Sequence, residues 1–161
     1  MVDMSGFTKL TDSHGVVHYL SMVRRMQLTA EPIVKSYRGS IVKFEADNAF
    51  ARFENPANAI RATIALNLAL DSANLLTPDE LDIYISAGID HGKCLFPHPH
   101  DFFGNPVNRA SKLGEDIGKP GQILVTKNAM EMVPDNLEIK ANPVSVEFGG
   151  KKEQGFSVQF K

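Results

Sequence analysis

The chain has 161 residues, a formal net charge of −2, 43% hydrophobic residues and 22% charged residues. This length suits one domain with its own core, and the slight acidic balance excludes the basic excess of nucleic-acid-binding proteins. The single cysteine, Cys94, excludes an internal disulfide, and no apolar run is long enough to span a membrane. We expect one cytoplasmic domain over residues 1–161, with no nucleic-acid partner and no membrane contact of its own.

The chain begins with a strand that ends at Asp3 and looks truncated, because few apolar residues precede it. Apolar residues then recur at helical spacing over residues 16–33, which predicts a long helix that either runs on or breaks near Pro32. Gly39 is expected to end it.

A hairpin and a second helix follow. Residues 40–45 and 49–53 are typical of two short strands around a tight turn that carries Asp47. Asn55-Pro56 then supplies a cap and a first-turn proline for a helix that stops before Thr77.

The second half predicts mainly strands. Residues 81–89 alternate like a half-buried strand, and the proline-rich segment 97–100 must reverse the chain. A short helix is expected over 105–113, a strand over 121–125, and a terminal hairpin over 144–160 that turns at Gly149-Gly150.

This order of elements indicates an α+β fold, a ferredoxin-like sandwich with helices packed on one face of a mainly antiparallel sheet. In that topology the first strand lies beside the central hairpin. The end of the first strand, Asp3, and the hairpin tip, Asp47, are then expected to face each other, although 44 positions separate them in the sequence.

Two adjacent carboxylates repel each other unless a divalent cation lies between them. Oxygen ligands favour Mg²⁺ or Mn²⁺ over zinc. The alternative is that Asp3 caps the following helix and Asp47 serves only the turn, since aspartate is common at both kinds of position.

Other polar segments also have two interpretations. Ser5, Gly6, Phe7 and Thr8 precede a helix, where backbone N–H groups favour phosphate, although Ser5 or Thr8 can equally be a simple helix cap. The histidines at 91, 98 and 100 are more typical of solvated loops than of a transition-metal site, and Cys94 is expected to be a small buried strand residue.

Four segments resemble, in order, the motifs of class III adenylate and guanylate cyclase catalytic domains. They are Asp3-Met-Ser-Gly-Phe-Thr8, Lys43-Phe-Glu-Ala-Asp47, Gly88-Ile-Asp-His-Gly92 and Phe103-Gly-Asn-Pro-Val-Asn-Arg-Ala-Ser-Lys112. The resemblance covers nearly the whole chain and implies the nucleotide cyclase fold.

The resemblance also implies roles for individual residues. Asp3 and Asp47 would bind two Mg²⁺ or Mn²⁺ ions per site, which activate the ribose 3′-hydroxyl and neutralise the triphosphate during attack on the α-phosphorus. Lys43 and Asp101 would read adenine, which favours ATP over GTP, since a lysine donor suits N1 and an aspartate acceptor suits the amino group. Asn108 would orient the ribose and Lys112 would stabilise charge on the phosphorane.

Some positions depart from the family pattern. Lys112 replaces the usual arginine and offers a point charge instead of a planar fork. Ala46 replaces the usual glycine, which is tolerable if its φ is negative. The connection from Gly92 to Gly104 is shorter than in most relatives, and Lys151 marks only an approximate position for a phosphate-contacting lysine.

In this family the metal-binding aspartates come from one protomer, and the base, ribose and phosphorane contacts come from the other. The resemblance therefore implies an adenylate cyclase that forms 3′,5′-cyclic AMP and pyrophosphate in a homodimer with composite sites at the interface. The alternative is a catalytically weak or silent cyclase-like module that binds nucleotide or a partner. A guanylate cyclase is a third option, against which Lys43 and Asp101 argue.

Overall fold

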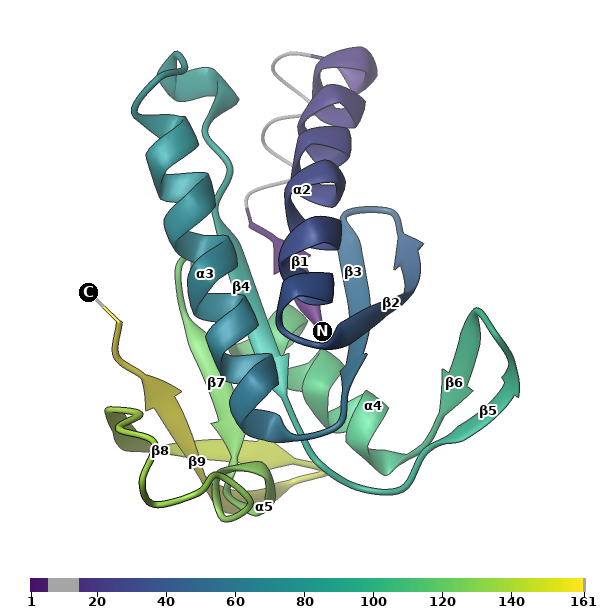
Figure 1. Cartoon of the computed structure of the whole chain (residues 1–161), viewed down its shortest axis with the longest axis vertical. Helices are drawn as coiled ribbons and strands as arrows, with labels where there is room; N and C mark the ends of the chain where they lie inside the picture. Colours follow the sequence, from purple (N-terminus) through teal and green to yellow (C-terminus); the bar gives the residue numbers. More distant parts are fainter. Residues whose placement is uncertain (6–14, 161) are drawn as a thin grey trace.

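The structure is a computed structural model that describes residues 1–5 and 15–160. Figure 1 shows two long helices in front of a twisted sheet, with a small two-stranded arm at one side. The strands are β1 Val2–Met4, β2 Gly39–Glu45, β3 Asn48–Phe53, β4 Ile85–Ile89, β5 Leu95–His98, β6 Asp101–Phe103, β7 Ile123–Thr126, β8 Ala141–Phe148 and β9 Lys151–Val158. The helices are α2 Val16–Ser36, α3 Pro56–Asn74, α4 Asn105–Ser111 and α5 Lys127–Met130, with a 3₁₀ turn at Asp79–Leu81 and a π-helical turn at Lys112–Ile117.

The main sheet has seven strands in the order β2-β3-β1-β4-β7-β9-β8. Neighbouring strands run antiparallel except β4 and β7, which run parallel. The first strand, β1, lies between the hairpin strand β3 and the central strand β4, as the ferredoxin-like topology requires. The predicted α+β fold with a mainly antiparallel sheet is confirmed.

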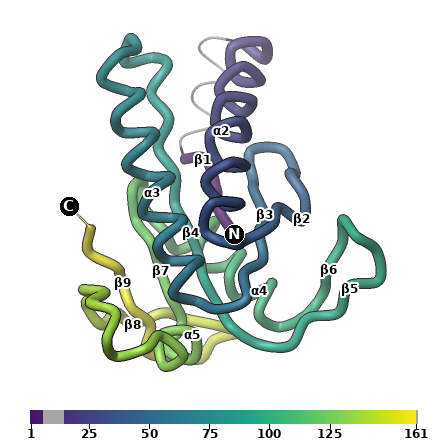
Figure 2. Tube along the Cα trace, in the orientation of Figure 1, coloured from purple at the N-terminus to yellow at the C-terminus, as the bar shows by residue number. Residues whose placement is uncertain are grey.

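Helices α2 and α3 lie side by side on one face of the sheet (Figure 2). Their apolar stripes enclose a core with the inward side chains of β1 and β4, including Met22, Met26, Leu66 and Ile85. Sequestering such side chains from water is the main stabilising contribution in a domain of this size. Helix α2 runs through Pro32 without a break.

We predicted helices on one face of the sheet only. Helix α4 instead packs on the opposite face. Successive residues of β4 point to opposite faces, so Ala87 contacts the α3 side while Gly88 faces α4. A Cβ atom at Gly88 would lie 2.0 Å from the carbonyl oxygen of Ala110, so only glycine permits this approach. A hydrogen bond of 2.7 Å from the Ser86 hydroxyl to the Gly114 carbonyl also holds the π-helical turn after α4 against β4.

Several helix and strand boundaries agree with those predicted from the sequence. The β2–β3 hairpin and the β8–β9 hairpin, with its turn at Gly149-Gly150, have nearly the predicted bounds. Helix α3 begins as expected, with the Asn58 amide donating to the Asn55 side chain at 2.9 Å and Pro56 in the first turn.

Two local predictions are wrong and one is confirmed. Strand β4 starts only at Ile85 and is buried along its whole length, because it lies in the middle of the sheet with helices on both faces. The chain does reverse at residues 97–100, as predicted, and this segment forms the tip of the β5–β6 arm. Cys94 is half-buried and precedes β5 instead of lying within a strand.

Across residues 1–5 and 15–160, the helices are too short or too polar to cross a membrane.

Candidate functional site

The predicted carboxylate pair comes together at one end of the sheet. Asp3 pairs in register with Asn48, the residue after Asp47, and the Met4 amide donates to the Asp47 carbonyl at 3.3 Å. The cause is topological, since β1 ends exactly where the β2–β3 hairpin turns. The 44-residue separation in the sequence is therefore closed by strand pairing.

This closeness perturbs the ionisation of Asp3. Its pKa is raised from 3.8 to about 7, first by burial, then by the charges of Asp47 and Glu115. A carboxylate that resists ionisation beside another carboxylate is stabilised by a cation between them. In the described part of the chain, no three His, Cys, Asp or Glu side chains are arranged to hold an ion by themselves. The pair thus offers two ligands, and further oxygens must come from elsewhere.

Two further side chains adjoin the pair. Tyr19 of α2 is only 6% exposed, and its hydroxyl lies within electrostatic range of the Asp47 carboxylate. Burial, followed by the charge of Asp47, raises the pKa of Tyr19 to about 12, so the hydroxyl keeps its proton. Glu115, in the π-helical turn, accepts a hydrogen bond of 3.0 Å from the Asn48 side chain.

The predicted base-reading pair is also brought together. Lys43 of β2 and Asp101 of β6 lie within electrostatic range, because the arm packs on β2 through a contact of 3.3 Å between His100 Nδ1 and the Val42 carbonyl. Lys43 also forms an ion pair of 2.8 Å with Glu45. Its pKa is raised, first by the hydrogen bond to Glu45 and then, against burial, by the charges of Glu45 and Asp101.

Asn108 and Lys112 are one helical turn apart and both exposed, Asn108 in α4 and Lys112 at the start of the π-helical turn. Side chains four positions apart share one helix face, so they can serve one ligand. Lys112 forms an ion pair of 2.8 Å with Asp116. Both partners are about half exposed, so this pair is weak and the lysine can exchange Asp116 for a phosphate.

An unpredicted residue, Arg109, fixes the position of α4. Its Nε lies 3.2 Å from the Asp90 carboxylate, whose side chain is only 3% exposed, and its Nη2 lies 2.8 Å from Glu153. The guanidinium carbon lies 4.0 Å from the ring centroid of Phe148. Arg109 therefore ties α4 to the end of β4 and to the β8–β9 hairpin.

The remaining predicted substrate-binding residues are Lys151 and residues 5–8. Lys151 is exposed at the β8–β9 turn, opposite Phe148 in the strand register. Ser5 donates its backbone N–H to the Tyr84 carbonyl at 2.8 Å. Gly6, Phe7 and Thr8 lie outside the described residues.

Ala46 does not meet the condition of a negative φ under which alanine would be tolerable at this position. Its φ is +51°, a left-handed conformation that costs an L-residue about 1–2 kcal/mol relative to the right-handed one. The hairpin tip that carries Asp47 is thus strained where glycine would fit freely.

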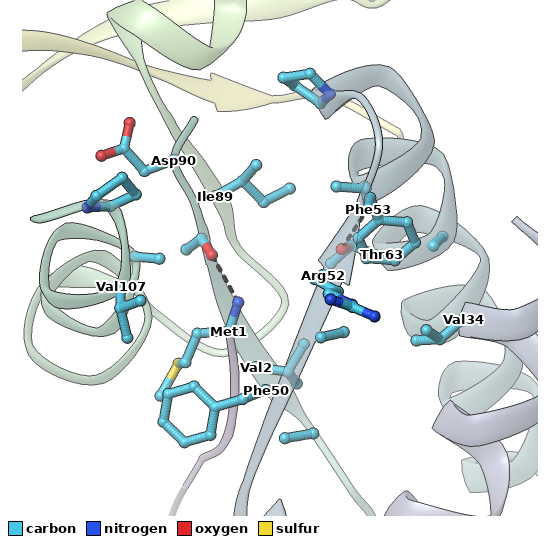
Figure 3. A pocket seen from close by; sticks show the side chains of 18 of the residues that line it. Met1, Val2, Val34, Phe50, Arg52, Phe53, Thr63, Ile89, Asp90 and Val107 are labelled. Atoms are coloured by element: carbon cyan, nitrogen blue, oxygen red, sulfur yellow. Dashed lines mark hydrogen bonds between the residues drawn. The ribbon is translucent and has the colours of Figure 1, made fainter. Parts of the chain in front are cut away.

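The chain also holds a cavity of about 310 Å³, mostly apolar, between β3, β4, α3 and α4 (Figure 3). Figure 3 shows Met1 at its centre, with its amino group donating to the Gly88 carbonyl at 3.0 Å. Phe102 and Val107, each next to a predicted site residue, contribute to the lining. Asp90, the partner of Arg109, also lines it, whereas Asp3, Asp47, Lys43, Asp101, Asn108, Lys112 and Lys151 do not.

Sequence reasoning missed Tyr19, Glu45, Arg109 and Glu115. Glu45 was detectable, because it lies two positions from Lys43 on a strand and must share its face. Tyr19, Arg109 and Glu115 act through contacts across tertiary structure, and no local pattern signals them.

The chain is similar to known proteins over nearly its whole length. The family model described as the adenylate and guanylate cyclase catalytic domain matches residues 1–159. A protein of Rhizobium meliloti (strain 1021) named "Putative adenylate cyclase 3" is 25% identical over 137 residues, which are 85% of this chain and 23% of that protein. The chain spans 23% and 36% of the lengths of the first curated relatives that it matches.

Two solved structures show the same fold. An adenylate/guanylate cyclase/hydrolase from Silicibacter pomeroyi is 25% identical, with a TM-score of 0.77 over 98% of this chain and 92% of that one. The adenylyl cyclase CyaB from P. aeruginosa is 20% identical, with a TM-score of 0.82 over 99% of this chain and 91% of that one. The chain therefore belongs to the family of class III adenylate and guanylate cyclase catalytic domains.

Proposed function

We propose that this chain is an adenylate cyclase that converts ATP to 3′,5′-cyclic AMP and pyrophosphate. The observation that carries the proposal is the convergence of Asp3 and Asp47 at the end of β1, which leaves two adjacent carboxylates with a raised pKa at Asp3. Two adjacent carboxylates repel each other, which is unfavourable for the fold unless a cation binds between them.

Asp3 and Asp47 would hold Mg²⁺ or Mn²⁺, since both are hard cations that prefer oxygen ligands. When bound, these ions lower the pKa of the ribose hydroxyl and neutralise the triphosphate. The protonated Tyr19 hydroxyl, which lies within electrostatic range of Asp47, would help to orient that carboxylate. The backbone of Ser5 to Thr8 would contact the phosphates.

Lys43 and Asp101 support adenine as the base. The lysine ammonium only donates hydrogen bonds and suits N1 of adenine, and the Asp101 carboxylate only accepts and suits the exocyclic amino group. The Phe102 amide donates to Asp101 Oδ1 at 3.0 Å, which orients this carboxylate. A site built on such hydrogen bonds discriminates strongly against a base that leaves them unpaired.

Asn108 and Lys112 would act at the ribose and the α-phosphorus. The 3′-hydroxyl gives its proton to water, its oxygen bonds to the α-phosphorus, and the bond to the leaving pyrophosphate breaks. Asn108 orients the ribose ring, and the Lys112 ammonium stabilises the negative charge of the phosphorane. Lys151, on the hairpin that Arg109 anchors, would contact the phosphates.

The family pattern assigns these two sets of residues to different protomers of one site. We infer a homodimer in which Asp3 and Asp47 of one copy meet Lys43, Asp101, Asn108 and Lys112 of the other. Two-fold symmetry then produces two equal sites.

A silent cyclase-like module that binds nucleotide without turning it over is the second candidate. Three observations favour it: Lys43 and Lys112 are each paired with a carboxylate at 2.8 Å, and Ala46 is strained beside Asp47. A protein of this kind would bind ATP tightly without making product.

The test is incubation with Mn²⁺ and ATP, followed by quantification of cyclic AMP and pyrophosphate. The wild-type chain should release both in equal amounts, and Asp47→Asn should release neither. Asp135→Asn, at an exposed loop position between α5 and β8, is the matched control and should be as active as the wild type. ATP binding without product would favour the silent module, and product from Asp47→Asn would refute the assigned site.

A further inference from the structure

The tip of the β8–β9 hairpin turns one face toward α4 and the π-helical turn that follows it. Phe148 of β8 lies opposite Lys151 of β9 in the strand register, and the next residues on the same face are Val146 and Glu153, which also lie opposite each other. Directly paired residues of antiparallel strands share one face of a sheet. Val146 is 3% exposed and belongs to the same core cluster as Leu113 of the π-helical turn. Lys151 is therefore on the α4 side of the hairpin.

Arg109 of α4 contacts this face on both strands. Its Nη2 lies 2.8 Å from Glu153 Oε2 and its Nη1 lies 3.4 Å from Glu153 Oε1, so the planar guanidinium binds both carboxylate oxygens. The guanidinium carbon lies 4.0 Å from the ring centroid of Phe148. The buried Asp90 carboxylate lies 3.2 Å from Nε and fixes the other edge of the guanidinium. The side chain thus connects the end of β4 to both strands of the hairpin.

Lys151 adjoins both hairpin residues that Arg109 contacts. It lies opposite Phe148 and two positions before Glu153. The pKa of Glu153 is lowered, first by the hydrogen bond from Arg109 and then, against burial, by the charges of Arg109 and Lys151. The lysine is therefore within electrostatic range of the carboxylate that Arg109 holds. The turn before it, Gly149-Gly150, has no side chains that could fix the tip of the hairpin.

We infer that Arg109, acting through Glu153, is a positioning residue that holds Lys151 against the phosphates of the nucleotide. This inference rests on the proposed function and deepens it, because it says how the phosphate contact is set. Asn108 and Arg109 are adjacent in α4. One helix therefore places the ribose contact directly and the phosphate contact through the hairpin.

Glu153 can affect phosphate binding in two ways that have opposite signs. A carboxylate repels a nearby phosphate, so its removal strengthens phosphate binding if Glu153 acts by charge alone. If Glu153 holds the hairpin, its removal frees Lys151, and the conformational entropy of ordering the lysine is then lost when phosphate binds. Phosphate binding weakens in that case. The sign of the change separates the two effects.

The experiment compares the wild type with Glu153→Ala, Lys151→Ala and the double variant. One probe is inorganic tripolyphosphate with Mn²⁺, titrated by calorimetry, and the other is AMP, which lacks the β- and γ-phosphates. The KM and kcat for ATP are measured in parallel. Glu147→Ala is the matched control: Glu147 is an exposed carboxylate of the same hairpin, it lies on the opposite face from Phe148, and it contributes to the electrostatic field at Lys112.

For Glu153→Ala we expect tripolyphosphate binding to weaken, and the KM for ATP to rise, by about threefold to tenfold, part of the contribution of one charge-assisted hydrogen bond. AMP binding and kcat should change less than about twofold, since the contact is made to the β- and γ-phosphates in both ground and transition states. The melting temperature should fall less than about 2 °C, because the side chain of Glu153 is 41% exposed.

The double variant tests whether Glu153 acts through Lys151. Glu153→Ala should cause no further loss of tripolyphosphate binding when Lys151→Ala is already present. Glu147→Ala removes the same charge without touching Arg109, so its tripolyphosphate binding should equal or exceed that of the wild type.

Tripolyphosphate binding that is unchanged or tighter in Glu153→Ala overturns the inference. An equal loss in the Lys151→Ala background does so too, as does a wild-type chain that does not bind tripolyphosphate. The proposed cyclase function fails separately, if ATP yields no cyclic AMP. Tripolyphosphate binding then still decides the role of Arg109 and Glu153, because it needs no turnover.

Discussion

Arg109→Ala should destabilise the domain more than any exposed charge substitution. The side chain is the one ionic partner that the structure gives to the Asp90 carboxylate, which is buried with 3% side-chain exposure. Asp90 also accepts hydrogen bonds from the Thr126 hydroxyl and from the His91 amide, the latter at 2.8 Å. Both of these donors bind Oδ1, so removing Arg109 leaves Oδ2 unpaired.

The magnitude follows from these contacts. Removing one partner of a buried ion pair costs about 3–5 kcal/mol, and the two donors that remain on Asp90 reduce this to about 2 kcal/mol. Loss of the Phe148 contact adds about 0.5–1 kcal/mol, and loss of the exposed Glu153 pair adds less than about 0.5 kcal/mol. The sum is about 3 kcal/mol, which corresponds to a fall in melting temperature of about 6–12 °C for a domain of this size.

The assay is urea unfolding of the wild type, Arg109→Ala, Asp90→Ala and the double variant. The two single changes should not add, because either one breaks the same pair. Lys127→Ala, which removes an exposed pair of 3.7 Å, is the control and should cost less than about 0.5 kcal/mol. A loss below about 1 kcal/mol for Arg109→Ala, or strict additivity, would refute the assigned role of this network.

Three further predictions concern the site and its support. Ala46→Gly should raise the free energy of unfolding by about 0.5–1 kcal/mol, because glycine adopts φ +51° without strain, and thermal unfolding measures it. Without metal, the contribution of Asp3 to stability should fall as the pH rises from about 4 to about 7, because its folded-state pKa exceeds its unfolded value of 3.8. Asp3→Asn should lack that decline in urea titrations across this pH range. Gly88→Ala should prevent α4 from packing on β4, because the new Cβ would lie 2.0 Å from the Ala110 carbonyl oxygen. The free energy of unfolding should fall by more than about 3 kcal/mol. Retention of wild-type stability would contradict this packing.

The fold was largely predictable because its elements have strong local signals. The turn around Asp47, the cap at Asn55 and the glycines at 149 and 150 fix three boundaries by backbone chemistry alone. The β5–β6 arm was not predictable, because its short strands contain Pro97 and lack a regular alternation.

The convergence of Asp3 and Asp47 was predictable from topology, since β1 beside a hairpin places both at one end of the sheet. The sign of φ at Ala46 was not, because a hairpin tip admits several turn types. The roles of Arg109 and Tyr19 depend on partners 44 and 28 positions away, Glu153 and Asp47, which no local pattern reveals.

The central claim is that one copy supplies the metal-binding aspartates and the other supplies the base and ribose contacts. It is tested most directly by mixing Asp47→Ala with Asn108→Ala and measuring cyclic AMP formation from ATP. Each variant alone should be inactive, and the equal mixture should regain about a quarter of the wild-type activity, because half of the dimers are mixed and each has one intact site. A mixture that stays as inactive as its components, although mixed dimers form, would contradict the claim.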